Sequence, residues 1–321
     1  MRILCIQLRQ MGDVMMTTCA LRQLRTIYAQ AEIVFMSEPL GANVYQNNPN
    51  VSRLWIIPRK PSIWAFATLL RRVYRERFDL VIDFFGNPKS AQITFASRAK
   101  ERVGFDFRFR RYAYTRRVVL EDKGEYAARS KNRLIAHLGG RLDDTQIEFF
   151  TDEKARRYAR EFSDRYGFDD KTIAFCVVSR RSYKMLDPTF FAEVGDALIA
   201  AGYKLFFVYG PSEKPLAETV FKRLERPQNA IIDYDMPNVQ ELKAILEFCA
   251  LYVGVDGGSK HLSVTAKTPT VAIFNGVRAE NWTAKGHSAF QIENGATPKE
   301  VIEACLLQLR KKEGGGNADR S

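Results

Sequence analysis

The sequence predicts an α/β protein made of two doubly wound domains in tandem, with parallel sheets facing a central cleft. Two observations predict this class. Apolar runs alternate with amphipathic helical patterns along the 321 residues, and several runs are almost continuously apolar, as is typical of strands buried on both faces. A polar, charged segment at 151–170 divides these runs into two series, and we interpret it as a helix followed by the domain junction.

The expected N-terminal domain covers residues 1–160 and the expected C-terminal domain covers 161–296. The pattern at 297–312 predicts a last helix that is a candidate to pack back on the N-terminal domain, and the composition of 313–321 predicts a flexible tail. Strands are predicted at 2–8, 31–36, 53–58 and 79–84 in the first domain, and at 172–178, 204–210, 229–234, 251–255 and 270–274 in the second. Helices are predicted at 17–29, 190–202 and 239–250.

The composition favours an anionic partner and an intracellular protein. Lys and Arg number 49 against 37 Asp and Glu, a net charge of +12, which suits nucleic acid, anionic lipid or phosphorylated substrates. Neither a membrane span nor a signal peptide is recognisable, so a cytosolic protein is expected. The five scattered cysteines form no C-x-x-C pair, which excludes a disulfide framework or zinc site as the interpretation and favours buried core thiols.

A carboxylate occupies the first turn between strand and helix, where dinucleotide-binding proteins place a glycine-rich phosphate loop. Here the turn holds one glycine and one acid, Gly12-Asp13. Asp13 can cap the following helix by accepting a hydrogen bond from the backbone N–H of Met15 or Met16. Alternatively, it can face the cleft as a general base. The position alone favours the cap.

Two loops of the second half have the chemistry of a phosphate site. Residues 256–259 read Asp-Gly-Gly-Ser between a strand and a helix that carries His261, so free backbone N–H groups and the positive end of the helix dipole are available. The loop after the strand at 172–178 carries Ser179, Arg180, Arg181 and Lys184, and it is expected at the same edge of the sheet. An ordinary glycine-rich turn and a solvated basic loop are the alternatives.

The segment 98–117, RAKERVGFDFRFRRYAYTRR, interleaves arginines with aromatic residues. An extended chain here would present Arg108 and Arg110 on one side. Such a pattern suits nucleic acid, phosphorylated sugars or an anionic membrane, and it also occurs on solubilising surfaces.

Taken in order, these segments resemble the ADP-heptose:lipopolysaccharide heptosyltransferases, glycosyltransferase family nine. The resemblance begins with RILCIQL and MGDVMMTTCALRQLR and continues through NNPNVSRLW, DLVIDFFGNPKSAQITFASRAKERVGF, KLFFVYGPSEK and GVDGGSKHLSVTAKTPTVAIFNG, with Trp282 soon after. It implies a GT-B fold of two Rossmann-like domains, with the acceptor bound mostly by the first and the nucleotide sugar mostly by the second. It also implies inverting transfer without a metal ion or other cofactor.

The resemblance assigns roles to individual positions. Asp13 corresponds to the general base, and Lys184 to the lysine that contacts the donor, with Ser179 and Arg180 beside it. Glu213 is similar to the acid that binds the nucleoside ribose. The family motif D-(S/T)-G-x-x-H falls on Asp256, Gly257, Gly258 and His261. Apart from the resemblance, the basic segment makes Arg108, Arg110 and Arg111 candidates to hold phosphates on the acceptor.

Three positions depart from the family pattern. Gly257 stands where Ser or Thr is usual, Lys260 where an apolar residue is more common, and Arg180 where a small or hydroxyl residue is common. These departures put the donor in question and leave the phosphate chemistry intact, since Arg and Lys add positive charge.

The predicted function is heptose transfer from ADP-heptose to a lipopolysaccharide (lipid A) core acceptor by a cytoplasmic enzyme, peripheral at the inner face of the cytoplasmic membrane. The alternatives are a transferase of the same fold with another nucleotide sugar, a nucleotide-sugar epimerase, a sugar-binding module without activity, and a nucleic-acid-binding protein that uses 98–117. Nucleic acid is not the expected partner; an anionic membrane surface is.

Overall fold

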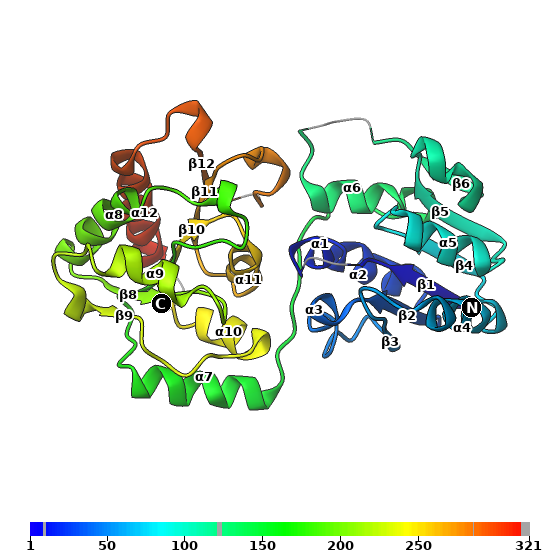
Figure 1. Cartoon of the computed structure of the whole chain (residues 1–321), viewed down its shortest axis with the longest axis horizontal. Coiled ribbons are helices and arrows are strands. Elements are labelled where there is room, and N and C mark those ends of the chain that lie inside the picture. The colour runs from blue at the N-terminus through cyan, green and yellow to red at the C-terminus, as the bar shows by residue number, and fades with distance from the viewer. Residues whose placement is uncertain (9–10, 121–123, 285, 316–321) are drawn as a thin grey trace. The chain divides into compact units, whose positions relative to one another are not determined.

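The structure is a computed structural model that describes residues 1–8, 11–120, 124–284 and 286–315. The chain divides into two compact units, Met1–Phe150 and Thr151–Ser321. Each contains one six-stranded, all-parallel sheet with helices on both faces (Figure 1). Among the described residues, no helix is both long enough and apolar enough to cross a bilayer.

The first unit has the strand order β3-β2-β1-β4-β5-β6. The strands are β1 (Arg2–Ile6), β2 (Glu32–Ser37), β3 (Arg53–Ile56), β4 (Leu80–Asp83), β5 (Glu101–Phe105) and β6 (Arg116–Val118). The helices are α1 (Met11–Met15), α2 (Thr18–Ile27), α3 (Pro39–Ala42), α4 (Ile63–Arg75), α5 (Pro88–Ala96), α6 (Ala127–Arg133) and the 3-10 turns η1 (Arg108–Ala113) and η2 (Ala136–Leu138). On one face of the sheet α4 packs against α5 and α5 against η1, over a core that includes Leu4, Met36 and Val81.

The second unit repeats this order as β9-β8-β7-β10-β11-β12. The strands are β7 (Thr172–Cys176), β8 (Lys204–Phe207), β9 (Ala230–Ile231), β10 (Leu251–Val255), β11 (Thr270–Phe274) and β12 (Ser288–Gln291). The helices are α7 (Glu153–Arg165), α8 (Pro188–Ala200), α9 (Lys214–Phe221), α10 (Val239–Leu246), α11 (Gly258–Thr265), α12 (Pro298–Gly315) and the 3-10 turns η3 (Ser182–Lys184), η4 (Pro227–Asn229), η5 (Ala279–Asn281) and η6 (Ile292–Asn294).

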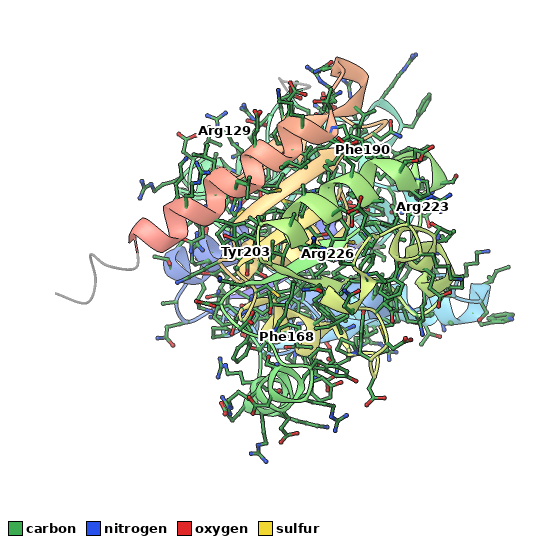
Figure 2. All side chains as sticks on the ribbon, turned by 90° about the vertical axis from the view of Figure 1, so that its left-hand side faces the viewer. Arg129, Phe168, Phe190, Tyr203, Arg223 and Arg226 are labelled. Carbon is green, nitrogen blue, oxygen red and sulfur yellow. The ribbon has the colours of Figure 1, made fainter. Side chains whose placement is uncertain are left out.

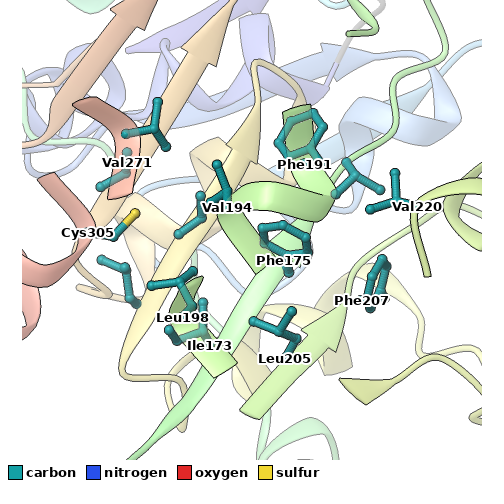
Figure 3. Packing of buried hydrophobic residues seen from close by; sticks show 14 of the residues in the cluster. Ile173, Phe175, Phe191, Val194, Leu198, Leu205, Phe207, Val220, Val271 and Cys305 are labelled. Carbon is teal, nitrogen blue, oxygen red and sulfur yellow. The ribbon is translucent and has the colours of Figure 1, made fainter. Parts of the chain in front are cut away.

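The core of the second unit lies between this sheet and α8, α9 and α12. Figure 3 shows Phe175 and Phe207 from neighbouring strands beside Val194 and Leu198 of α8. Cys305 of α12 is fully buried in the same cluster. All five cysteine side chains are buried, and the described residues contain no disulfide, as the sequence predicts.

One boundary differs from the prediction. The sequence places the end of the first domain at residue 160, but α7 belongs to the second unit, because its buried face packs against α10 and Phe162 makes edge-on contacts with the rings of Phe206 and Tyr234. The last helix, α12, packs on α8 of its own unit, and the two helices lie side by side (Figure 2), because its apolar residues complete the core there.

The predicted tail, 313–321, lies outside the described residues from 316 onward, and α12 continues through Gly315. Every strand predicted from the sequence contains an observed strand, whereas β5, β6 and β12 were not predicted.

Candidate active site

In both sheets the chain first adds strands toward one edge and then toward the other. The order reverses between β1 and β4 in the first unit and between β7 and β10 in the second. Open α/β sheets bind ligands at the carboxyl ends of the strands at such a point. The loops after these four strands are therefore the places where a site is expected. The sequence-predicted residues Asp13, Lys184 and Asp256 all follow one of these strands.

In the second unit Lys184 and Asp256, 72 positions apart, meet at this point. The Lys184 Nζ lies 2.5 Å from Asp256 Oδ2, and the Lys260 Nζ lies 2.9 Å from Asp256 Oδ1. The carboxylate of Asp256 is almost fully buried and has one ammonium group on each oxygen. Burial raises the pKa of Asp256, but Lys260, His261 and Lys184 outweigh it and hold the pKa well below its usual range. Asp256 is therefore ionised at neutral pH.

Lys260 explains how a carboxylate is tolerated next to a predicted phosphate loop. Its side chain is only 2% exposed, donates a hydrogen bond to the carbonyl oxygen of Trp282 at 2.6 Å and lies 5.0 Å from the centre of the Phe274 ring. Burial lowers the pKa of Lys260 to about 8, against the opposing attraction of Asp256. The residue that departs from the family pattern thus balances the charge of Asp256, a role that its position alone did not reveal.

The glycines precede and open α11 as the sequence predicts. Gly257 is the N-cap residue in an extended conformation, and Gly258 is the first helical residue. A Cβ built on Gly257 would meet nothing closer than the Val255 carbonyl oxygen at 4.0 Å, so this backbone adjoins open space. The hydroxyl of Ser259 turns away to the Tyr252 hydroxyl at 2.9 Å. Backbone N–H groups, not hydroxyls, are what this turn offers to an anion.

His261 is buried beside the same cluster, 3% exposed, with its ring centre 6.0 Å from that of Trp282. Burial and then Lys260 push the pKa of His261 well below its ordinary value, so its imidazole is neutral at neutral pH. Among the described residues, no hydrogen-bond partner reaches its Nδ1. A neutral ring can orient a neighbouring group but adds no charge.

The other predicted donor residues lie at the same carboxyl edge. Ser179 follows β7 and its hydroxyl accepts a hydrogen bond from the Arg181 N–H at 3.3 Å, while Arg180 is exposed. Glu213 follows β8, the neighbour of β7, and its Oε2 accepts the Gly210 N–H at 2.6 Å. Glu213 thereby closes its own turn.

In the first unit Asp13 is the third residue of the short helix α1 and does not cap it. The cap interpretation is wrong in this form, because the Met16 N–H donates to the Gly12 carbonyl oxygen at 3.1 Å and the N-cap of α2 is Thr17. The side chain of Asp13 is half-buried. It lies within the short helix that follows β1.

Lys131 of α6 is within reach of the charge of this carboxylate, and the sequence did not predict it. Its Nζ donates to the Phe84 carbonyl oxygen at 2.7 Å, just after β4. Burial lowers the pKa of Lys131, while the charges of Asp13 and Asp83 raise it. Nothing in the helix that carries Lys131 signals this role, since it is one of several basic residues there.

Asp83 holds the loop after β4 and was also missed. It is fully buried, its Oδ1 accepts the N–H groups of Phe85 at 3.0 Å and Gly86 at 2.8 Å, and its Oδ2 accepts the Tyr114 hydroxyl at 2.8 Å. Burial raises the pKa of Asp83 despite these hydrogen bonds. Gly104 lies under the Tyr114 ring, where a Cβ would come within 2.3 Å of ring carbon.

The basic segment differs from its predicted form. The chain is extended only as far as Phe107, and residues 108–113 form the 3-10 turn η1, so Arg108, Arg110 and Arg111 do not line one side of a strand. Arg111 pairs with Asp106 through two contacts of 2.6 and 3.0 Å, Arg110 lies 5.3 Å from the Phe107 ring centre, and Arg108 is exposed.

Two parallel sheets of the same strand order, each with charged residues at its central carboxyl edge, define the GT-B fold of nucleotide-sugar glycosyltransferases. The chain belongs to glycosyltransferase family 9 (heptosyltransferase), whose family model matches residues 66–309, and it is a glycosyltransferase.

Known proteins agree with this assignment. The lipopolysaccharide heptosyltransferase 3 of Escherichia coli is 22% identical over 295 residues, which cover 88% of this chain and 86% of that protein. The family 9 glycosyltransferase of Veillonella parvula DSM 2008 has a structure with a TM-score of 0.85, 22% identity and 97% coverage of both chains. The E. coli ADP-heptose LPS heptosyltransferase II has a TM-score of 0.76 at 19% identity, covering 98% of this chain and 100% of that one.

Proposed function

We propose that this glycosyltransferase transfers a heptose from ADP-heptose to a sugar of a lipopolysaccharide core, with inversion at the anomeric carbon and without a metal ion. The proposal rests most directly on the meeting of Lys184 and Asp256 beside the open N-terminal turn of α11. Family membership and the names of the two E. coli relatives supply the donor and the acceptor class.

The donor side follows from charge. The carboxylate of Asp256 pairs with two ammonium groups, so the cluster has a net positive charge. Lys184 can therefore contact a diphosphate while Lys260 stays paired with Asp256. Backbone N–H groups at Gly257 and Gly258 and the dipole of α11 add to this potential. We assign the remaining donor contacts to Ser179, Arg180, His261 and, for the ribose hydroxyls, Glu213.

The chemical step is a single displacement. The acceptor hydroxyl oxygen forms a bond to the anomeric carbon as the bond from that carbon to the diphosphate oxygen breaks, and ADP leaves with the bonding electrons. Asp13 takes the hydroxyl proton, and the charge that develops on the leaving diphosphate is stabilised by Lys184 and the N–H groups of α11. We assign a positioning role beside Asp13 to Lys131, which is held at the Phe84 carbonyl and is attracted by the charge of Asp13.

The acceptor side is assigned to the first unit. Arg108, Arg110 and Arg111 are proposed to contact phosphates of the core, and the net charge of +12 suits an enzyme that works in the cytoplasm, peripheral at the inner face of the membrane. Nucleic acid is not proposed as a partner.

The decisive experiment combines a donor panel with two variants. ADP-heptose and UDP-, GDP- and CMP-sugars are compared by thermal stabilisation, and the glycosylated acceptor is identified by mass spectrometry. Asp13→Asn should lower transfer by about 100-fold or more while ADP binding is kept. Lys184→Ala should weaken ADP binding by at least about tenfold, since a hydrogen bond to a charged group is lost, whereas Lys154→Ala on the exposed face of α7 should change neither.

Three outcomes would count against the proposal. If Asp13→Asn transfers sugar as fast as the wild type, Asp13 is not the general base. If Lys184→Ala binds ADP with an unchanged dissociation constant, Lys184 does not contact the diphosphate. Conversion of a nucleotide sugar without any acceptor would instead indicate an epimerase. Preference for a donor other than ADP-heptose would keep the mechanism and change the substrate, as the departures at Gly257 and Arg180 allow.

A further inference from the structure

One surface of the first unit exposes large apolar side chains that the proposed chemistry does not use. We call residues 56–75, from the last residue of β3 through α4, the α4 surface. Ile56 is 57% exposed, Ile63 85% and Trp64 83%. Scattered exposed apolar residues are ordinary, but three of this size within nine positions mark a contact surface.

The helix itself is well formed, so this exposure is built into the fold. The Ser62 hydroxyl accepts the Ala65 N–H at 3.2 Å and caps α4, and Val73 is fully buried while Phe66, Leu69 and Leu70 pack on the core. The outer face carries Trp64, Thr68, Arg71 and Arg75, at the spacing i, i+4, i+7 and i+11 of one helical stripe, and all four are exposed.

The charge of the α4 surface has a single sign. No Asp or Glu occurs from Gly41 to Arg75, whereas Arg53, Arg59, Lys60, Arg71, Arg72 and Arg75 are basic. In the part of the chain that the structure describes, no carboxylate forms an ion pair with Arg59, Lys60, Arg71 or Arg75. Arg71 and Arg75 also line a hollow of about 470 Å³ with Arg2, Thr68, Arg72 and Glu76, whose carboxylate pairs with Arg2 and Arg53.

The α4 surface begins near the edge of the sheet where Asp13 lies. The loop before α4 is fixed there, because Lys89 donates to the Arg59 carbonyl oxygen at 3.0 Å and pairs with the buried Glu38, just after β2, at 2.8 Å. A partner on the Ile63–Trp64 end of this surface would therefore bind at the carboxyl edge of the first unit's sheet, whereas Arg71 and Arg75 lie toward the opposite edge, where α4 ends and β1 begins (Figure 1).

We propose that the α4 surface docks on an anionic lipid bilayer, with Ile63 and Trp64 at the boundary between headgroups and acyl chains and Arg59, Lys60, Arg71 and Arg75 on lipid phosphates. A Trp-bearing apolar end followed by a basic stripe is the composition of helices that lie in a membrane interface. A second copy of this chain is a poorer occupant, because a twofold contact would bring like charges together. The inference rests on the proposed function in one respect, that the acceptor is anchored to a lipid.

The test uses the full chain and vesicles of phosphatidylcholine alone or with 30% phosphatidylglycerol, about the proportion at which anionic headgroups attract basic segments strongly. We expect salt-sensitive binding to the anionic vesicles only. Ile63→Ser with Trp64→Ser should weaken it by at least about tenfold. Arg71→Gln with Arg75→Gln should weaken it by about 25-fold, since each cation near the surface contributes about fivefold.

Two control double variants distinguish binding through the α4 surface from nonspecific hydrophobic or electrostatic adsorption. Phe248→Ser with Leu307→Ser removes exposed apolar residues of the second unit, 42% and 53% exposed. Lys154→Gln with Arg157→Gln removes two exposed cations from α7. Both double variants should bind as the wild type does. Tryptophan emission should shift to the blue on anionic vesicles and lose this shift in Trp64→Phe, because Trp55 is already buried and the third tryptophan, Trp282, lies in the second unit.

The proposal is overturned if the wild type does not bind anionic vesicles, if the α4 variants bind equally well, or if the controls lose as much. It is also overturned if the wild type is a dimer that Ile63→Ser with Trp64→Ser makes monomeric while vesicle binding is unchanged. Transfer to a delipidated acceptor in solution separates membrane docking from the proposed transferase function. The α4 variants should keep wild-type turnover with this acceptor. Absence of that turnover in the wild type would refute the proposed function and leave vesicle binding as an independent result.

Discussion

Replacing Lys260 by methionine tests the balance of charge around Asp256. Methionine fills nearly the same volume, so the change removes one of the two ammonium groups and little packing. Removing one partner of a buried ion pair costs about 3–5 kcal/mol because the other charge is left uncompensated. Lys184 still contacts Asp256, so we expect the lower end, about 3 kcal/mol. In a unit of this size that corresponds to a fall of roughly 6–12 °C in melting temperature.

The assay is scanning calorimetry of the full chain, which separates the transitions of the two units if they unfold independently. Lys243→Met is the matched control. Like Lys260, Lys243 pairs with a carboxylate four positions away in the chain, but the side chain of its partner, Glu247, is 37% exposed. Its loss should cost less than about 1 kcal/mol. In an Asp256→Asn background Lys260→Met should cost far less than in the wild type, because the charge that Lys260 balances is gone.

The pH dependence of unfolding provides a second test of the charge balance between Lys260 and Asp256. Burial lowers the pKa of Lys260 to about 8 from its ordinary 10.5, so between these values the unfolded state holds a proton that the folded state has lost. The stability of the wild type relative to Lys260→Met should therefore rise with pH in that window, by at most about 1.4 kcal/mol per pH unit. Equal costs of Lys260→Met in both backgrounds, or a difference that falls with pH, would refute the reasoning.

Three further results are expected. Gly104→Ala should destabilise the first unit by about 1–3 kcal/mol by urea unfolding, because its Cβ would come within 2.3 Å of the Tyr114 ring; a neutral effect would mean that the ring has room to move. Asp83→Ala should cost more than Asp83→Asn, which keeps an acceptor for the N–H groups of Phe85 and Gly86, and the wild type should gain stability relative to Asp83→Asn as the pH falls through the raised pKa of Asp83. A thiol reagent should label none of the buried cysteines until denaturant is added, and fast labelling of the native chain would contradict their burial.

The architecture was predictable because the central strands of both sheets are apolar runs. The missed strands are those without such a run. Arg116–Val118 and Ser288–Gln291 are the outermost strands of their sheets, and their exposed or polar residues do not alternate clearly. Glu101–Phe105 begins with two charged residues and was taken as part of the basic segment. The edge strands β3 and β9 keep an apolar run and were predicted, so β6 and β12 were missed because they lack such a run, which an edge position permits.

In the site, sequence reasoning found the residues that stand directly after central strands and missed those that reach them from elsewhere. Asp256 and Lys184 could be predicted to share an edge because each follows a strand. Lys131 reaches the Phe84 carbonyl from 47 positions away, and Tyr114 reaches Asp83 from 31. No periodicity or spacing encodes such contacts, which depend on how the helices and turns pack on the sheet.

Each sheet is built from one contiguous stretch of chain, and both have the same strand order. Selection on one sheet can therefore act separately from selection on the other. The last helix packs on α8 of its own unit, and the boundary between the units falls at Phe150–Thr151. Under the proposed assignment of the acceptor to the first half and the donor to the second, changes that adapt one half to a new ligand need not disturb the buried charges of the other. A lineage can therefore exchange one half by recombination at a single crossover, which offers a physical route to enzymes that share a donor and differ in what they glycosylate.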